Sequence, residues 1–378
     1  MDIKFTEEQE ILRNSSRDFL ASRCPRSLIR ATMLEGSEYP ENLWSEMADL
    51  GWMGLIIPSE YGGIGGKFMD LIILLEEMGR ACMAGPFFST AVGGGLILLD
   101  AANEQQKRQW LPALANGKLK IALAVNEPEV DLNPKYISTS ATETADGYII
   151  NGIKLFVSDA HTADYIIGAC RIEKNGVLEK GVTLFLVDGK AKGVIKTPLK
   201  TICDDKQFEV VFKKVKVSKE NVLGKKGLGW KYLNRVLPKM AVAKCAEMVG
   251  GAQYVLEMTV DYSKQRIQFG KPIGAFQAVQ YHCVDMLSDT DLSRWITYKA
   301  AWMIDEGIPF DKEASIAIAR CSEAYRRVVA LGHQVHGGVG FILDHDMPLY
   351  FKHSRMNEIA LGDANLHRDI IANRLFFK

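Results

Sequence analysis

The most constraining feature of this sequence is that its hydrophobic periodicity changes twice along the chain. Apolar residues recur at helical spacing in residues 1–118 and 224–378. Between them, residues 119–223 form short β-favouring runs, separated by turn dipeptides such as Asp146-Gly147 and Asn151-Gly152. This order predicts an α+β protein with an N-terminal α-helical domain (1–118), a middle antiparallel sheet or small β-barrel (119–223) and a C-terminal helical bundle (224–378).

Local signals place the individual elements. Thr6 and Gln9 have the spacing of a capping box, which predicts a helix start before Ile11. Further helices are expected at 69–84, 104–115, 231–266, 276–306, 311–331 and 367–376, and strands at 121–125, 138–144, 147–150, 163–169, 183–187 and 208–217.

Composition excludes several classes of protein. Lys plus Arg and Asp plus Glu both number 46, so the chain lacks the basic excess that nucleic-acid binding usually needs. The longest apolar stretch, 91–99, is far shorter than the roughly 18 residues of a membrane-spanning helix. The N-terminus is polar and acidic, and the seven cysteines form no CxxC pair. We therefore expect reduced thiols in a cytoplasmic protein, and the histidine spacing indicates no metal site.

Two segments carry ligand-binding chemistry. Residues 266–277 read Arg-Ile-Gln-Phe-Gly-Lys-Pro-Ile-Gly-Ala-Phe-Gln, in which Arg266 follows a predicted helix and precedes a glycine turn. A guanidinium there suits a pyrophosphate, although a surface arginine at a helix corner has the same pattern. Residues 334–341 read Gln-Val-His-Gly-Gly-Val-Gly-Phe, whose glycines allow a backbone to approach a ligand or simply end a helix. His336 alone is more typical of a packed structural histidine.

Together these segments resemble the acyl-CoA dehydrogenase family, and the likeness covers essentially the whole chain. Glu60-Tyr61-Gly62-Gly63 is similar to the family's N-terminal loop, and Asn126-Glu127-Pro128 to its Thr-Glu-Pro turn. Residues 151–159, Asn-Gly-Ile-Lys-Leu-Phe-Val-Ser-Asp, resemble the family's Asn-Gly-x-Lys-x-Trp-Ile-Thr-Asn strand.

The resemblance implies a fold and an activity. The fold is an N-terminal α domain, a middle β-barrel and a C-terminal four-helix bundle. Members bind FAD, remove a proton from Cα of an acyl-CoA thioester and pass a hydride from Cβ to the flavin. Electrons leave through an electron-transfer flavoprotein, and members are usually tetramers.

The resemblance also implies roles for individual residues. Asn126, Phe156 and Ser158 would lie near the flavin ring of the chain's own FAD. The FAD of a neighbouring subunit would contact Arg266, Gln268, Phe269, Gln334, Gly337 and Gly338, and Gln277 is a further cofactor-binding candidate.

Two departures from the family pattern concern catalysis. Residues 129–133, Glu-Val-Asp-Leu-Asn, replace the usual Gly-x-Gly-Ser-Asp loop near the flavin and thioester. Leu361 occupies the position of the usual catalytic glutamate, and Met240 lies near the position that a minority of the family uses instead. Leucine cannot accept a proton, but the backbone N–H of Leu361 could still bind the thioester carbonyl.

Three hypotheses follow for the missing base. In the first, another carboxylate of this chain replaces it, either Asp363, Glu247 or Asp159; Asp363 is, however, better explained as a helix N-cap. In the second, a related partner chain supplies the base in an α2β2 heterotetramer, since residues 85–91 and the ending 362–368 resemble that subgroup. In the third, the chain is a non-oxidative, desulfinase-like flavoprotein or a scaffold subunit.

Overall fold

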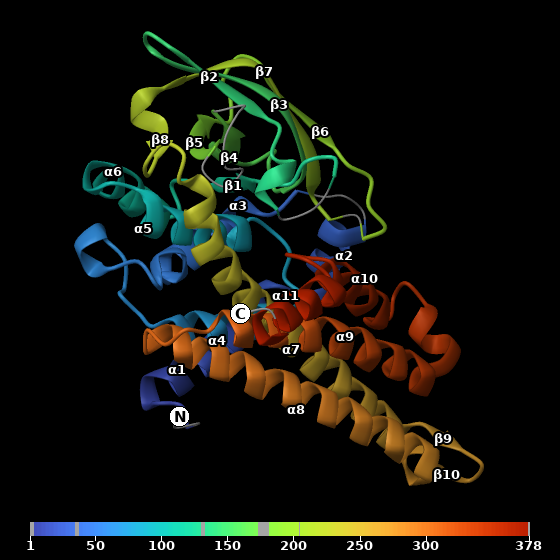
Figure 1. The fold of residues 1–378 in the computed structure, drawn as a ribbon. Helices are drawn as coiled ribbons and strands as arrows, with labels where there is room; N and C mark the ends of the chain where they lie inside the picture. The colour runs from blue at the N-terminus through green and yellow to red at the C-terminus, as the bar shows by residue number, and fades with distance from the viewer. Residues whose placement is uncertain (1–3, 35–37, 130–132, 173–180, 204, 377–378) are drawn as a thin grey trace. The chain divides into compact units, whose positions relative to one another are not determined.

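The computed structural model of the chain describes residues 4–34, 38–129, 133–172, 181–203 and 205–376 (Figure 1). The chain forms two compact units. One comprises 1–38, 67–84 and 241–378, and the other comprises 39–66 and 85–240. Residues of the predicted N-terminal domain therefore occur in both units. Residues 130–132, in the altered loop noted above, lie outside the described part.

The first unit consists mainly of helices. Its long helices α8 and α9 run beside one another, and a short two-stranded hairpin follows the end of α7 (Figure 1). Its elements are α1 (Glu7–Arg23), α2 (Arg26–Leu34), α4 (Phe68–Ala81), the part of α7 (Gly229–Gln265) from residue 241 onward, β9 (Ile267–Gln268), β10 (Lys271–Pro272), η7 (Ile273–Ala275), α8 (Gln277–Asp305), α9 (Asp311–His336), η8 (Gly337–Phe341), α10 (Met347–Glu358) and α11 (Ala364–Phe376).

The predicted capping box at the start of α1 is confirmed. The Gln9 N–H donates to Thr6 Oγ1, and the Thr6 N–H donates to Gln9 Oε1 at 3.2 Å. The amide of Gln9 also donates to Asp70 of α4 at 2.8 Å, so the cap ties two helices together.

Helices α4 and α7 cross at two glycines. A Cβ atom on Gly79 would lie 2.0 Å from the backbone oxygen of Glu247, and one on Gly250 would lie 1.8 Å from that of Glu76. Real Cβ atoms do not approach that closely, so only glycine permits this crossing. The close approach fixes the α7 segment that carries Glu247.

The second unit contains a sheet and short helices. Its elements are α3 (Glu41–Asp49), η1 (Trp52–Gly54), η2 (Ser59–Tyr61), the π-helical η3 (Phe88–Gly94), α5 (Gly95–Ala101), α6 (Glu104–Ala115), β1 (Ile121–Ala124), η4 (Pro134–Tyr136), β2 (Ser140–Thr144), β3 (Gly147–Ser158), β4 (Tyr165–Arg171), β5 (Val182–Asp188), β6 (Val194–Pro198), β7 (Gln207–Ser218), η6 (Lys219–Asn221), β8 (Val222–Leu223) and the first turns of α7.

The strand order in the sheet is β6-β7-β3-β2-β4-β5-β8, and β1 pairs with β4. Most neighbours are antiparallel, as expected, but β1 runs parallel to β4, and β2 meets β4 in a parallel bridge. The buried side chains of the sheet form one apolar core, which includes Ile150 of β3, Phe185 of β5 and Phe212 of β7. The register of β3 against β7 shifts between Lys154 and Val157, and this irregularity positions part of the candidate site.

Several elements differ from the sequence prediction. Strand β3 continues to Ser158, well beyond the predicted end at residue 150, because it pairs along its length with β7. Helix α9 extends to His336, and β6 and α10 were not predicted. Strand β6 alternates weakly in polarity, so only its pairing with β7 defines it. Within the described ranges, no helix is both long and apolar enough to cross a bilayer.

Candidate active site

A buried ion pair connects two of the sequence motifs in the sheet unit. The Lys154 ammonium lies 2.7 Å from Glu127 Oε1, and both side chains are almost fully excluded from water. Glu127 also accepts hydrogen bonds from the backbone N–H groups of Ser138 and Thr139. Burial opposes ionisation of Glu127, but Lys154 and these donors outweigh it and lower the pKa of the carboxyl group. The pair fixes the turn at residue 126 against strand β3.

The residues predicted to face a flavin ring lie beside this pair. The Asn126 carbonyl accepts from the Leu155 N–H at 2.9 Å, which holds the turn against β3. Phe156 lies in the irregular segment of β3 with a φ of 53°, and its ring is 43% exposed. A positive φ is rare for an aromatic residue, so the surrounding contacts impose this conformation. Ser158 exchanges hydrogen bonds with Gln207 of β7. An exposed ring and a hydroxyl group are thus presented by one strand.

Asp159, one of the three carboxylates proposed as a replacement base, follows directly. It also has a positive φ, of 55°, and one of its oxygens accepts a hydrogen bond from Ser89 Oγ at 3.0 Å. This contact attaches the end of β3 to helix η3. The carboxylate therefore has a structural partner within its own unit.

In the helical unit, the first predicted motif forms a hairpin. Strands β9 and β10 pair antiparallel, and the turn residues Phe269 and Gly270 have φ values of 53° and 79°. Two successive positive φ values define the type I′ turn, which matches the twist of a two-stranded ribbon. Arg266, Gln268 and Gln277 are exposed, and the Phe269 side chain is 91% exposed. Among the described residues, Arg266 has no acidic partner.

The second predicted motif lies at the same end of the unit. The ring of His336, the last residue of α9, stacks on Tyr262 of α7 at 4.4 Å. Arg266 follows Tyr262 by four residues, and its N–H donates to the Tyr262 carbonyl. Gly337 has a φ of 63°, and a Cβ atom on Gly337 or Gly338 would meet nothing within 4 Å. These glycines leave open space beside an exposed backbone, and Gln334 is exposed nearby.

The sequence did not indicate that helix α2 holds residues 343–346, the segment that follows the second motif. Arg30 donates to the carbonyls of Leu343 and Asp344 and forms a 2.6 Å ion pair with Asp346. Arg26 pairs with the other oxygen of Asp346 at 3.0 Å. Two arginines four residues apart on one helix were the available signal.

The turn at Leu361, where the resemblance predicts the usual catalytic glutamate, is strained. Leu361 has a φ of 60°, a conformation that costs a leucine about 1–2 kcal/mol, and Gly362 follows at 99°. Among the described residues, no backbone carbonyl accepts a hydrogen bond from the Leu361 N–H. Asp363 accepts from the Leu366 N–H at 2.8 Å and is thus the N-cap of α11, as the sequence indicated.

Helix α7 carries two further positions considered for the base, Met240 and Glu247, and only the second has a carboxylate. Met240 is buried, and its methyl carbon would lie 3.3 Å from a Cβ atom on Gly93, so an apolar side chain fills that place. Glu247 forms a short ion pair with Lys244, three residues earlier on the same helix. Its carboxylate is therefore already neutralised.

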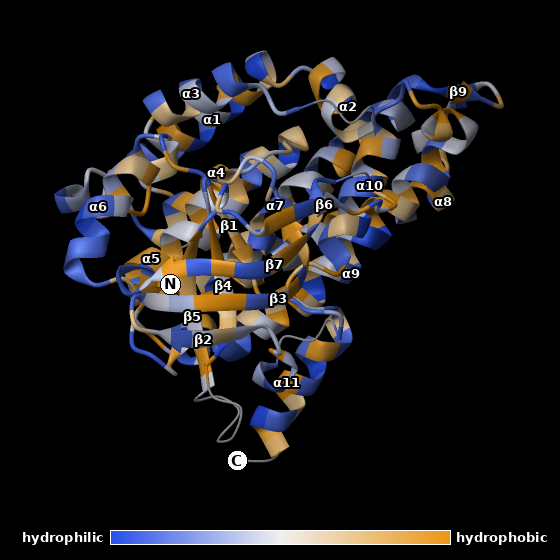
Figure 2. Ribbon diagram, turned by 90° about the horizontal axis from the view of Figure 1, so that it is seen from above, coloured by the Kyte–Doolittle hydropathy of each residue, from blue (hydrophilic) through white to orange (hydrophobic). Residues whose placement is uncertain are grey.

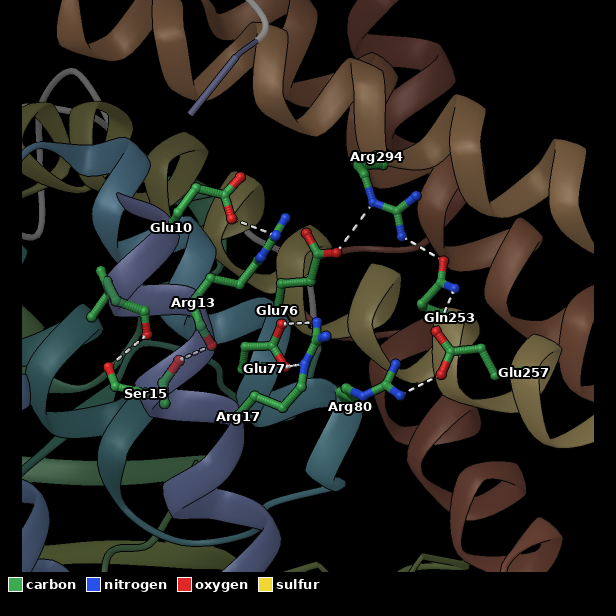
Figure 3. Close-up of polar contacts among 12 residues, drawn as sticks. Glu10, Arg13, Ser15, Arg17, Glu76, Glu77, Arg80, Gln253, Glu257 and Arg294 are labelled. Atoms are coloured by element: carbon green, nitrogen blue, oxygen red, sulfur yellow. Dashed lines mark hydrogen bonds and ion pairs between the residues drawn. The ribbon is translucent and has the colours of Figure 1, made fainter. Parts of the chain in front are cut away.

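A pocket of about 580 Å³ lies among α1, α4, α7 and α8 of the helical unit. Figure 3 shows that the charged groups at this place point toward one another in pairs. Arg294 lies 3.1 Å from Glu76, Arg17 lies 2.6 Å from Glu77, and Arg80 pairs with Glu257. This mutual neutralisation indicates a structural network. Within the described part of the chain, no cluster of His, Cys, Asp or Glu is arranged to hold a metal ion.

Comparison with known proteins identifies the class. Profiles of the acyl-CoA dehydrogenase N-terminal, middle and C-terminal domains match residues 6–118, 122–215 and 227–376. A 3-(aryl)acrylate reductase of Clostridium sporogenes is 30% identical over 98% of this chain and 99% of its own length. The probable acyl-CoA dehydrogenase YngJ of Bacillus subtilis is 30% identical over 99% of this chain and all of its own.

A solved structure agrees with these matches. Butyryl-CoA dehydrogenase of Megasphaera elsdenii is 28% identical, covers 99% of this chain and 100% of its own, and superposes with a TM-score of 0.93. The chain belongs to the acyl-CoA dehydrogenase family, whose members are FAD-dependent oxidoreductases acting on CH–CH bonds of acyl-CoA thioesters.

The residues present are suited to FAD. The exposed guanidinium of Arg266 suits a phosphate, and the open backbone at Gly337 and Gly338 permits close approach. In the sheet unit, the exposed ring of Phe156 and the hydroxyl of Ser158 provide an apolar face and a hydrogen-bonding group. The Ser158 hydroxyl is hydrogen-bonded to Gln207 in the absence of a ligand, so a flavin would compete with or share this contact.

Proposed function

We propose that this chain is an FAD-dependent acyl-CoA dehydrogenase-type enzyme in which Leu361 replaces the usual base. Bound FAD would supply a hydride acceptor for the substrate Cβ. The backbone N–H of Leu361 would donate to the thioester carbonyl and stabilise the negative charge that develops when Cα loses its proton. The observation that carries this proposal is the strained turn at Leu361, which leaves that N–H without a backbone partner.

Two groups of residues would contact FAD, one in the sheet unit and one at the end of the helical unit. Asn126, Phe156 and Ser158 would contact the flavin ring, with the amide and hydroxyl as hydrogen-bonding groups. A neighbouring subunit's FAD would take its phosphate and adenine contacts from the exposed residues at the end of the helical unit, namely Arg266, Gln268, Phe269, Gln277, Gln334, Gly337 and Gly338.

Contacts to the FAD of a neighbouring subunit require that this chain forms an oligomer. An exposed apolar surface on α8 supports such an assembly. Tyr281, Val284, Leu287, Leu292 and Trp295 of α8 are each at least 43% exposed. In Figure 2, hydrophobic and hydrophilic residues are both present in the part of α8 that is visible beside β9. Several large apolar side chains exposed on one helix favour a protein–protein contact there. We infer a homotetramer or an α2β2 heterotetramer.

A second candidate function, that of a base-less subunit in a heteromer, is favoured by the state of the carboxylates. Asp363 caps a helix, Glu247 pairs with Lys244, and Asp159 accepts from Ser89. Each proposed replacement base thus has another role. In this version, a related chain with glutamate at the position of Leu361 would complete the assembly.

An anaerobic spectral titration separates the two versions. The chain is purified alone, loaded with FAD and titrated with crotonyl-CoA, butyryl-CoA and dihydrocinnamoyl-CoA while the flavin absorbance is followed. Bleaching by a saturated thioester means that this chain oxidises its substrate unaided. Binding without bleaching, followed by bleaching in Leu361→Glu, means that the pocket is intact and lacks only a base. Failure to bind any thioester in either protein contradicts both versions.

The proposal also names an electron partner and a cellular compartment for this chain. One relative is a caffeyl-CoA reductase–Etf complex subunit of Acetobacterium woodii, which supports an electron-transfer flavoprotein as electron partner here. The seven cysteines are free thiols, and burial raises the pKa of Cys24, Cys82 and Cys170, in keeping with a reducing compartment such as the cytoplasm. We also retain the three-domain division at 1–118, 119–223 and 224–378.

A further inference from the structure

The turn at Leu361 is held by one side chain. His367, in the first turns of α11, is 7% exposed, and its Nε2 lies 3.0 Å from the Leu361 carbonyl oxygen. A carbonyl oxygen only accepts hydrogen bonds, so Nε2 carries the proton and Nδ1 carries the lone pair. In the described part of the chain, Nδ1 has no partner. Burial lowers the pKa of His367, which favours this neutral form.

Leu366 and His367 of α11 pack closely against Gly362, which leaves no room for a side chain at that position. A Cβ atom at Gly362 would lie 2.6 Å from the Leu366 side chain and 3.2 Å from His367 Nε2. The Asp363 cap fixes the start of α11, and the His367 N–H donates to the Asp363 carbonyl at 3.2 Å. His367 is therefore placed rigidly with respect to the carbonyl that it holds.

We propose that His367 is a positioning residue for the thioester. By fixing the Leu361 carbonyl, it keeps Leu361 in the left-handed conformation and leaves the Leu361 N–H available to the proposed substrate. This inference rests on the proposed function, because that function assigns the N–H to the thioester carbonyl. It adds that a side chain, and not only the backbone, determines how strongly the carbonyl is polarised.

A matched pair of variants tests the role. His367→Gln retains an N–H donor at the length of Nε2, whereas His367→Met has similar length and no donor. The FAD-loaded proteins are mixed with crotonyl-CoA or cinnamoyl-CoA labelled with ¹³C at the carbonyl, and the carbonyl stretching frequency is measured by infrared difference spectroscopy. We expect a lowered frequency in wild type and His367→Gln, and a frequency near the free value in His367→Met. The dissociation constant should rise about tenfold in His367→Met, as expected for one lost hydrogen bond.

The outcomes separate this inference from the proposed function. A lowered frequency in all three proteins overturns the role of His367 and leaves the proposed function standing. No binding, or no frequency shift, in the wild type overturns the proposed function and this inference with it. If His367→Met does not fold, Gly362→Ala perturbs the same contact, because the added Cβ atom would collide with Leu366 and press on His367 Nε2. Loss of the shift in that variant supports the inference, and an unchanged shift overturns it.

Discussion

The ammonium group of Lys154 lies 2.7 Å from Glu127 Oε1 at a place where both side chains are excluded from water. Lys154 also donates to the Val125 carbonyl at 3.1 Å. The two residues come from motifs 27 positions apart, and their pairing brings the Asn126 turn beside the strand that carries Phe156 and Ser158. The ion pair therefore organises the part of the chain proposed to face the flavin ring.

Removing one partner of this pair should destabilise the protein strongly. Lys154→Met leaves the Glu127 carboxylate buried without a counter-charge, and such changes cost about 3–5 kcal/mol. We expect a comparable decrease in the free energy of unfolding, measured with urea, together with a loss of bound FAD. Lys226→Met is the matched control, because it breaks the exposed pair between Lys226, which precedes α7, and Glu143 of β2. That change should cost less than about 1 kcal/mol. Equal effects would show that burial does not govern the role of Lys154.

The role of Asp363 as a cap can be distinguished from a role as base. Asparagine caps helices about as well as aspartate but cannot accept a proton at neutral pH. Asp363→Asn should therefore keep both the stability and any activity of the wild type, whereas Asp363→Ala should lose about 1 kcal/mol of stability. Thermal unfolding and thioester oxidation rates provide the measurements. A loss of activity of several orders of magnitude in the folded Asp363→Asn variant would identify Asp363 as the base instead.

Gly338 should matter for the cofactor and not for folding. A Cβ atom there meets nothing within 4 Å, and its φ lies outside the left-handed region, so Gly338→Ala fits the free protein. A ligand lying against the backbone would meet the added methyl group. We expect unchanged thermal stability of the FAD-free variant and a dissociation constant for FAD at least about tenfold higher, measured by flavin fluorescence. An unchanged FAD affinity would exclude close approach at this glycine.

His353 should make the protein less stable in acid. The Asn357 amide nitrogen donates to the His353 carbonyl and to its Nε2, both at 3.0 Å, so Nε2 is an acceptor and the ring is neutral. Burial, with a contribution from nearby Lys244, lowers the pKa of His353 from its ordinary 6.5 to about 3. Between about pH 3 and pH 6.5, His353 is protonated in the unfolded chain but stays neutral in the folded chain. Stability is complete above pH 6.5 and decreases as the pH falls, by about 1.4 kcal/mol per pH unit from this group.

The measurement is the free energy of unfolding at pH 7.5, 6.5, 5.5 and 5.0. His353→Gln should give a shallower dependence on pH than the wild type over this range, because glutamine does not titrate. Other buried histidines still contribute in both proteins, so the informative quantity is the difference between the two slopes. Parallel slopes would mean that His353 binds its proton in the folded state.

Much of the secondary structure could be predicted because it depends on local patterns. The capping box at Thr6 and helix α6 at Glu104–Ala115 follow from side-chain chemistry within one turn. Strand β3 was predicted too short, and β6 was missed, because each is defined by pairing with β7 and not by its own periodicity. The helix–sheet–helix order was nevertheless sufficient for the fold class.

The sequence by itself determined the family and the absence of a carboxylate at Leu361 and Met240, and it predicted which residues would bind the cofactor. These are statements about residue identity and order, which a sequence contains in full. Tertiary structure alone decided what each remaining carboxylate does, since Asp363, Glu247 and Asp159 differ only in the groups that surround them. It also decided that Lys154 pairs with Glu127 and that His367 holds the Leu361 carbonyl. Hydrogen bonds and ion pairs depend on distances of about 3 Å, and only folding brings such groups together.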